Sequence, residues 1–148
     1  FGPAYKGIPL VSATAIALSR EHDLEKPFVF NRKEEKQHGE KGLLVGSKVE
    51  GSVLVIDDVI TAGTAIREVV EIIRNTNAQI SGVAVALDRQ EKGLGELSAI
   101  QEIEKTLNIS VISIVSLEDI VSYLEFSEDK ELKRSLDSIK SYRNLYGV

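Results

Sequence analysis

The chain has 148 residues, and its 18 Lys and Arg against 23 Asp and Glu give a formal net charge of −5. Its 43% hydrophobic and 28% charged residues are typical of a folded protein, and we expect one domain over residues 1–148, without nucleic-acid or membrane partners and located in the cytoplasm. The absence of cysteine excludes disulfides, thiol nucleophiles and cysteine-ligated metals.

The first third of the chain predicts a helix, a strand and a loop. Gly7–Arg20 has apolar residues at helical spacing, and Pro27–Asn31 is a β-branched and aromatic run typical of a strand. Arg32–Gly46 is polar and charged and contains three glycines, so we expect a long loop of the kind that forms lids.

The remainder alternates between strand and helix patterns. Two continuous apolar runs, Ser52–Asp57 and Ile80–Leu87, predict strands buried on both faces of a parallel sheet. The other expected elements are a strand at Val111–Val115 and helices at Ala65–Arg74, Ser98–Leu107, Leu117–Leu124 and Asp129–Tyr142. This alternation predicts an α/β fold, in which helices flank a mostly parallel sheet and the crossovers are right-handed.

The start of the chain resembles the end of a strand. A helix that begins at Gly7 needs a preceding strand against which its apolar face can pack, and Phe1 and Gly2 are placed to end such a strand. We therefore expect the chain to be an N-terminally truncated fragment.

The segment Val53–Ala65 carries the most informative chemistry. A buried strand delivers Asp57 and Asp58 to its carboxyl end, where open α/β sheets bind their ligands. The short loop Thr61–Thr64 then enters a helix, whose first N–H groups can cradle a phosphate where Gly63 permits close approach. Two carboxylates beside a phosphate suit a ribose diol, held directly or through a hard cation. The same residues are compatible with turn formation and helix capping, and the pattern alone leaves both interpretations open.

Four blocks of the sequence resemble one enzyme family, and they occur along the chain in the order found in that family. Val53–Ala65 resembles the phosphoribosyl-diphosphate motif of type I phosphoribosyltransferases, whereas neither a P-loop nor a dinucleotide motif is present. Phe1–Pro9, Phe30–Gly39 and Leu87–Glu91 are similar to the orotate phosphoribosyltransferases in particular, and Tyr142–Val148 also resembles that family. The resemblance implies a Rossmann-like, type I phosphoribosyltransferase-like fold. It also implies transfer of a 5-phosphoribosyl group to orotate, which yields orotidine 5′-phosphate and pyrophosphate in pyrimidine biosynthesis, with Mg²⁺ as cofactor.

The resemblance also assigns roles to individual residues. Substrate contacts are implied for Tyr5, Lys6, Arg32, Lys33, Lys36, His38, Asp57, Asp58, Val59, Ile60, Thr61, Ala62, Gly63, Thr64, Ala65 and Arg89. Of these, Lys36, Asp57 and Asp58 are expected to be catalytic, and no metal site built from protein side chains alone is expected. Cations of the Arg32–Gly46 lid would stabilise charge on the leaving pyrophosphate, and Arg89 would bind the orotate carboxylate with Thr61 nearby. In the family the lid reaches into the neighbouring subunit, which implies a homodimer.

Each assignment has an alternative interpretation. The lid could instead be a solvated loop of mixed charge. Lys6 could be a surface residue, and Arg89 could be the ion-pair partner of Asp88. The family carries an N-terminal segment with further substrate contacts, which we expect to be missing from this chain, so one alternative is a folded but inactive fragment. A purine-type phosphoribosyltransferase would share Asp57–Ala65 without needing Arg89. A non-catalytic sensor of phosphoribosyl diphosphate that binds nucleic acid is disfavoured by the net charge.

Overall fold

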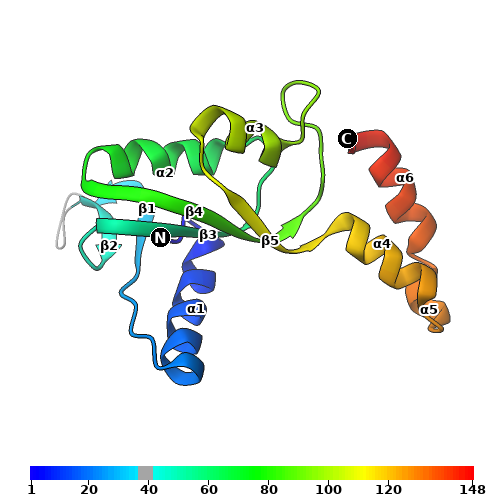
Figure 1. Cartoon of the computed structure of the whole chain (residues 1–148), viewed down its shortest axis with the longest axis horizontal. Coiled ribbons are helices and arrows are strands. Elements are labelled where there is room, and N and C mark those ends of the chain that lie inside the picture. The colour runs from blue at the N-terminus through cyan, green and yellow to red at the C-terminus, as the bar shows by residue number, and fades with distance from the viewer. Residues whose placement is uncertain (37–41) are drawn as a thin grey trace.

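The structure, a computed structural model, describes residues 1–36 and 42–148, with the backbone alone for residues 35 and 36. Figure 1 shows the course of the chain. In chain order the elements are α1 (Gly7–His22), β1 (Val29–Lys36), β2 (Gly42–Gly46), β3 (Glu50–Val59), α2 (Thr64–Arg74), β4 (Asn77–Asp88), α3 (Ala99–Leu107), β5 (Val111–Ser116), α4 (Leu117–Phe126), α5 (Lys130–Lys133) and α6 (Leu136–Tyr146).

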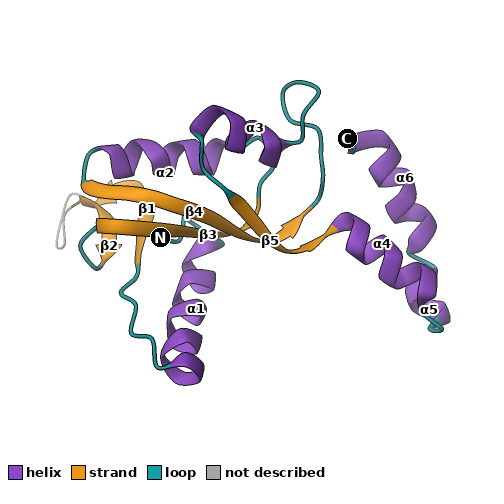
Figure 2. Ribbon diagram, in the orientation of Figure 1, coloured by secondary structure: helices purple, strands orange, loops and turns teal. Residues whose placement is uncertain are grey.

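A parallel sheet in the order β3-β4-β5 forms the centre of the molecule. Helices α2 and α3 lie on one face of this sheet and α1 lies against β3 on the other (Figure 2). The predicted α/β class, with its mostly parallel sheet flanked by helices, is confirmed. The continuous apolar runs correctly predicted parallel strands, but the expected burial on both faces is wrong. Val55, Val83 and Val85 on the α2 side are buried, whereas Leu54 on the other face of β3 is 43% exposed, because α1 covers that face only in part.

The hydrophobic core lies between the sheet and the helices α2 and α3. Val55 of β3 and Val83 of β4 are completely buried, and Ile66 of α2 and Ile103 of α3 pack against them. These helices present apolar residues at helical spacing on the face that meets the sheet. Within the part of the chain that the structure describes, no helix is both long and apolar enough to cross a membrane.

The first residues of the chain lie between β1 and β3. The Ile56 amide donates to the carbonyl of Phe1 (2.8 Å), and the Gly2 amide donates to the carbonyl of Val29 (2.9 Å). The expected strand-like pairing of Phe1 and Gly2 is therefore present. Gly7 approaches the neighbouring strand so closely that an added Cβ would lie 2.8 Å from the Ile56 carbonyl oxygen. This packing holds the turn before α1 against the carboxyl half of β3.

The prediction of a loop over Arg32–Gly46 is wrong for the described residues. β1 and β2 form an antiparallel pair in which Phe30 lies opposite Val45 and Asn31 opposite Leu44. The charged residues of β1 do not have the pattern of a strand, so the sequence did not reveal it. Pairing with β2 stabilises β1, and Leu44 of β2 packs on the core. Gly42 and Gly46 bound β2 with φ of 106° and 113°. His38 lies outside the described residues.

The prediction of one helix over Asp129–Tyr142 is also wrong. Asp129 caps the short helix α5 by accepting hydrogen bonds from the Glu131 and Leu132 amides, and α6 begins only at Leu136. The break lets α6 return along α4, where Lys140 Nζ lies 2.5 Å from Glu125 Oε1. Tertiary packing on α4 thus outweighs the uninterrupted helical pattern of the sequence.

A matched pair of isoleucines tests the position of the core. Ile103 is fully buried, whereas the side chain of Ile114 on β5 is 87% exposed. We expect Ile103→Ala to lower the free energy of unfolding by about 2–5 kcal/mol because it leaves a cavity, and Ile114→Ala to lower it by less than about 0.5 kcal/mol. Urea denaturation of the two variants measures both values, and equal losses would contradict this core assignment.

Candidate functional site

Two adjacent carboxylates stand at the carboxyl end of β3. Asp57 shares the α2 side of the strand with Val55, because successive side chains alternate between faces, and it is buried with 7% exposure. Its Oδ1 accepts a hydrogen bond from the Asp58 amide at 2.9 Å. Asp58 lies on the opposite face, where its Oδ2 is 2.6 Å from Lys6 Nζ. The pairing between Phe1 and β3 brings Lys6 to this position.

The two acids differ in their electrostatic environment. Burial raises the pKa of Asp57 to about 6, and the adjacent negative charge of Asp58 adds to this effect. Burial would also raise the pKa of Asp58, but the hydrogen bond and charge of Lys6, with the Val59 amide, bring that pKa below its ordinary value. Negative charge at this edge therefore rests first on Asp58, while Asp57 gains and loses its proton near neutral pH.

The loop after β3 enters α2 without a side-chain cap. Gly63 is the N-cap residue with φ of 72°, and an added Cβ there would lie 2.7 Å from Ile103 Cδ1. By contrast, Ser98 and Ser116 cap α3 and α4 through their side chains. Helix capping therefore does not account for Thr61 and Thr64, whose side chains are exposed at the start of α2. The α2 N-terminus retains backbone donors suited to an anion.

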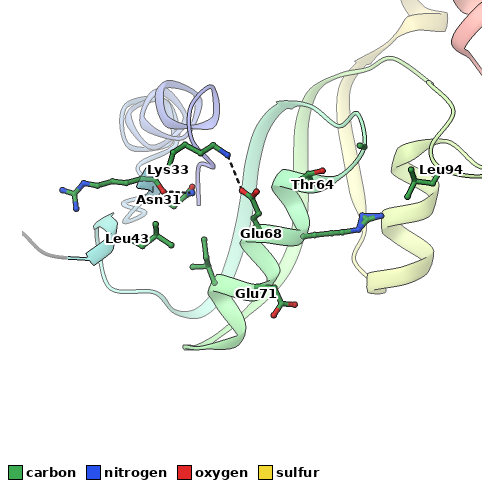
Figure 3. A pocket seen from close by; sticks show the side chains of 11 residues that line it. Asn31, Lys33, Leu43, Thr64, Glu68, Glu71 and Leu94 are labelled. Atoms are coloured by element: carbon green, nitrogen blue, oxygen red, sulfur yellow. Dashed lines mark hydrogen bonds and ion pairs between the residues drawn. The ribbon is translucent and has the colours of Figure 1, made fainter. Parts of the chain in front are cut away.

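A cavity of about 710 Å³ separates the β1–β2 hairpin from α2 (Figure 3). The lid cations Arg32 and Lys33 line it together with Ala62 and Thr64 of the loop. Lys33 Nζ lies 3.4 Å from Glu68 Oε2 on α2, an ion pair that bridges the cavity, and Arg32 Nη1 donates to the Gly42 carbonyl (3.0 Å). The structure thus brings two predicted lid residues beside the binding loop.

Arg89 follows β4 at the same edge of the sheet. Val59 lies opposite Leu87 in the parallel register, so the residues after both strands emerge side by side. The Arg89 guanidinium pairs with Glu91 (Nη2 to Oε2, 2.9 Å). The alternative that it pairs with Asp88 is wrong, because Asp88 Oδ1 instead accepts from the Gln90 amide at 2.8 Å.

The remaining predicted residues are distributed around this edge. Val59, Ile60, Gly63 and Ala65 are buried or half-buried parts of the segment that shapes the loop, and Ala62 and Tyr5 are exposed. Lys36 ends β1, but its side chain, like all of His38, lies outside what the structure describes. The lid contact of these two residues therefore stays a prediction.

The sequence analysis did not single out three side chains beside the site. Arg67 extends from the first turn of α2 to within 2.9 Å of the position of a Cβ on Gly63, and its Nη1 is buried without a hydrogen-bond partner in the described residues. Glu91 and Tyr142 contact each other near Arg89. A helical spacing of four from Gly63 could have indicated Arg67, whereas the sequence offers no signal for the contact between Glu91 and Tyr142.

Comparisons with known proteins agree on one family. A family model described as phosphoribosyl transferase domain matches residues 1–120. Orotate phosphoribosyltransferases of Aliivibrio fischeri and Photobacterium profundum are 58% and 60% identical over all 148 residues, and the chain covers 68% of each. The crystal structure of the Francisella tularensis orotate phosphoribosyltransferase superposes with a TM-score of 0.79 at 39% identity, covering 100% of this chain and 66% of that one. The chain thus spans about two thirds of the length of these relatives.

The buried position of Asp57 predicts a specific dependence of stability on pH. Its folded-state pKa of about 6 exceeds the ordinary value of 3.8, so the stability that its proton confers is complete below pH 4 and is lost as the pH rises through 6. As the pH rises from 4 to 7, we expect the free energy of unfolding of Asp57→Asn to increase by about 1–3 kcal/mol relative to that of the parent chain. Urea denaturation at several pH values measures this difference.

Asp58→Asn is the matched control. Because the pKa of Asp58 is lowered in the folded chain, its charge contributes stability above the ordinary pKa, and removing it should cost stability at pH 7. Differences from the parent chain that do not change with pH, or that have the same sign in both variants, would contradict the assigned environments.

Proposed function

Because the chain belongs to the phosphoribosyltransferase family and, within it, to the orotate phosphoribosyltransferases, we propose that its carboxyl-edge site carries out that family's reaction. Orotate phosphoribosyltransferases transfer the 5-phosphoribosyl group of phosphoribosyl diphosphate to a ring nitrogen of orotate. The products are orotidine 5′-phosphate, an intermediate of pyrimidine biosynthesis, and pyrophosphate.

One observation supports this proposal above the others. The parallel register of β3 and β4 places the acids, the uncapped start of α2 and Arg89 along a single edge of the sheet. Each of these groups matches one part of the two substrates. The α2 N-terminus suits an anionic phosphate, and the carboxylates suit the ribose hydroxyls. The Arg89 guanidinium suits the orotate carboxylate. A purine substrate has no carboxylate for Arg89 to bind, so the site favours orotate over a purine.

The proposed chemistry requires positioning more than covalent catalysis. Displacement of pyrophosphate leaves positive charge on the ribose ring, and a carboxylate held nearby stabilises that charge. Asp58 is the acid that stays ionised, since Lys6 lies against it, while Asp57 fixes the backbone of Asp58 through its hydrogen bond. Holding both substrates at one edge supplies the remaining advantage through proximity.

The site also suits Mg²⁺ delivered with the diphosphate. Mg²⁺ commonly binds to one or two protein carboxylates while substrate phosphates and water complete its shell, and two adjacent carboxylates at this edge fit that pattern. Asp57 and Asp58 would hold the ion, directly or through water, and the ion would neutralise charge on the leaving pyrophosphate. Lys6 would then exchange its contact with Asp58 for one with the diphosphate.

We further propose that the active protein is a cytoplasmic homodimer in which the lid serves the neighbouring subunit. Arg32 and Lys33 on the hairpin face the loop of their own chain in this structure, so Lys36 and His38 further along the lid are the candidates for a shared contact. The non-catalytic sensor is the weaker alternative, because a net charge of −5 does not favour nucleic acid.

Calorimetry with phosphoribosyl diphosphate and Mg²⁺ tests the acid pair. We expect Asp57→Asn/Asp58→Asn to weaken binding by about 10- to 100-fold, because hydrogen bonds to charged groups are lost. Asp23→Asn/Asp137→Asn removes the same charge from two exposed positions outside the site and should bind like the parent protein. Unchanged affinity in the first variant would exclude the acids from the binding site.

Subunit mixing tests the shared lid in the full protein. A Lys36→Ala subunit keeps its acid pair, and an Asp57→Asn/Asp58→Asn subunit keeps its lid. Each homodimer should be nearly inactive, whereas the heterodimer should regain one competent site, because contacts to transition-state charge are worth a few kcal/mol. Confirmed subunit exchange without recovery of activity would show that the lid acts within its own chain.

A further inference from the structure

Glu91 links Arg89 to the C-terminal helix. Its Oε2 lies 2.9 Å from Arg89 Nη2, and its Oε1 accepts a hydrogen bond from the hydroxyl of Tyr142 on α6. The Glu91 side chain is only 17% exposed, so this carboxylate is largely shielded from water between its two donors. The proposed reaction gives neither Glu91 nor Tyr142 a role.

The backbone of the C-terminal segment is joined to the same stretch. The Lys92 amide donates to the Tyr146 carbonyl (2.8 Å), and the Val148 amide donates to the Gln90 carbonyl (3.1 Å). The ring of Tyr146 packs on that of Tyr142 with centroids 4.9 Å apart. These contacts fix the distance between α6 and the segment after Arg89, so the Tyr142 hydroxyl is held in place at Glu91.

Glu91 is the side-chain partner of the Arg89 guanidinium in the described residues. Of the five N–H donors of the guanidinium, one at Nη2 contacts Glu91, and the Nε donor is buried without a partner in the described residues. A guanidinium binds a carboxylate through two parallel hydrogen bonds when its plane is aligned with that carboxylate, so a group that orients the plane strengthens the binding. The pair borders a cavity of about 430 Å³ that Tyr142 and Tyr146 also line, so Arg89 has room to turn if Glu91 releases it.

We propose that Glu91 is a positioning residue for Arg89 and that Tyr142 holds Glu91 in place, so that the C-terminal helix sets the orotate-binding end of the site. This inference rests on the proposed function, because it takes Arg89 as the group that binds the orotate carboxylate. The Glu91 carboxylate fixes one side of the guanidinium and leaves the other Nη1 and Nη2 N–H groups to the substrate. Tyr142 acts only through Glu91, at one remove from the substrate.

Steady-state kinetics and orotate calorimetry on the full protein test the proposal through Tyr142→Phe. The variant loses one hydroxyl and keeps the ring that packs on Tyr146. We expect the KM and Kd for orotate to rise about three- to tenfold, as for a hydrogen bond of ordinary net strength, while the KM for phosphoribosyl diphosphate is unchanged. Tyr123→Phe, at a tyrosine that is 66% exposed on α4, is the matched control and should match the parent.

A double-mutant cycle with Glu91→Ala separates positioning from folding. Glu91→Ala should raise the KM for orotate at least as much as Tyr142→Phe, and adding Tyr142→Phe to it should change nothing further, because the hydroxyl then has no carboxylate to hold. An equal rise in both KM values, an undiminished effect of Tyr142→Phe without Glu91, or tighter orotate binding by Tyr142→Phe would each overturn the proposal.

Arg89→Ala distinguishes failure of this inference from failure of the proposed function. If Arg89→Ala abolishes orotate binding but Tyr142→Phe has no effect, the positioning role is wrong and the function of Arg89 stands. If Arg89→Ala binds orotate like the parent protein, the assignment of Arg89 under the proposed function is wrong, and the positioning role falls with it.

Discussion

The register between β3 and β4 is the constraint on which the site depends. With Asp57 opposite Val85 and Val59 opposite Leu87, the two strands end together, and the acids and Arg89 must emerge at one edge. On its other side β3 pairs with Phe1, and that pairing carries Lys6 to Asp58. A shift of one residue would turn Asp57 away from the α2 side and exchange the environments of the two acids.

The candidate site gathers several features that are locally unfavourable for folding. Asp57 is a buried carboxyl with a raised pKa, Arg67 has a buried donor without a partner in the described residues, and α2 begins without a side-chain cap. Each feature costs folding free energy, and the core of Val55, Val83 and Ile103 offsets that cost. Features that are unfavourable locally cluster where a ligand would satisfy them, as is common at functional sites.

Local patterns predicted the parts of this structure whose cause is local. The apolar runs at β3 and β4 predicted parallel strands, and the pattern that begins at Ala65 predicted α2 to within one residue of its start at Thr64. The hairpin was missed because β1 is held by pairing with β2 and not by its own pattern. The contact of Glu91 with Tyr142 joins residues 51 positions apart, so only the fold could reveal it.

The outer strand of the sheet has a consequence for handling the protein. In the described part of the chain β5 pairs only with β4, and its Ile112 and Ile114 are 63% and 87% exposed. An open strand edge with apolar side chains recruits other chains by extending the sheet, which favours aggregation at high concentration. Self-association through this edge would be distinct from the homodimer proposed above, because it extends the sheet and does not involve the lid.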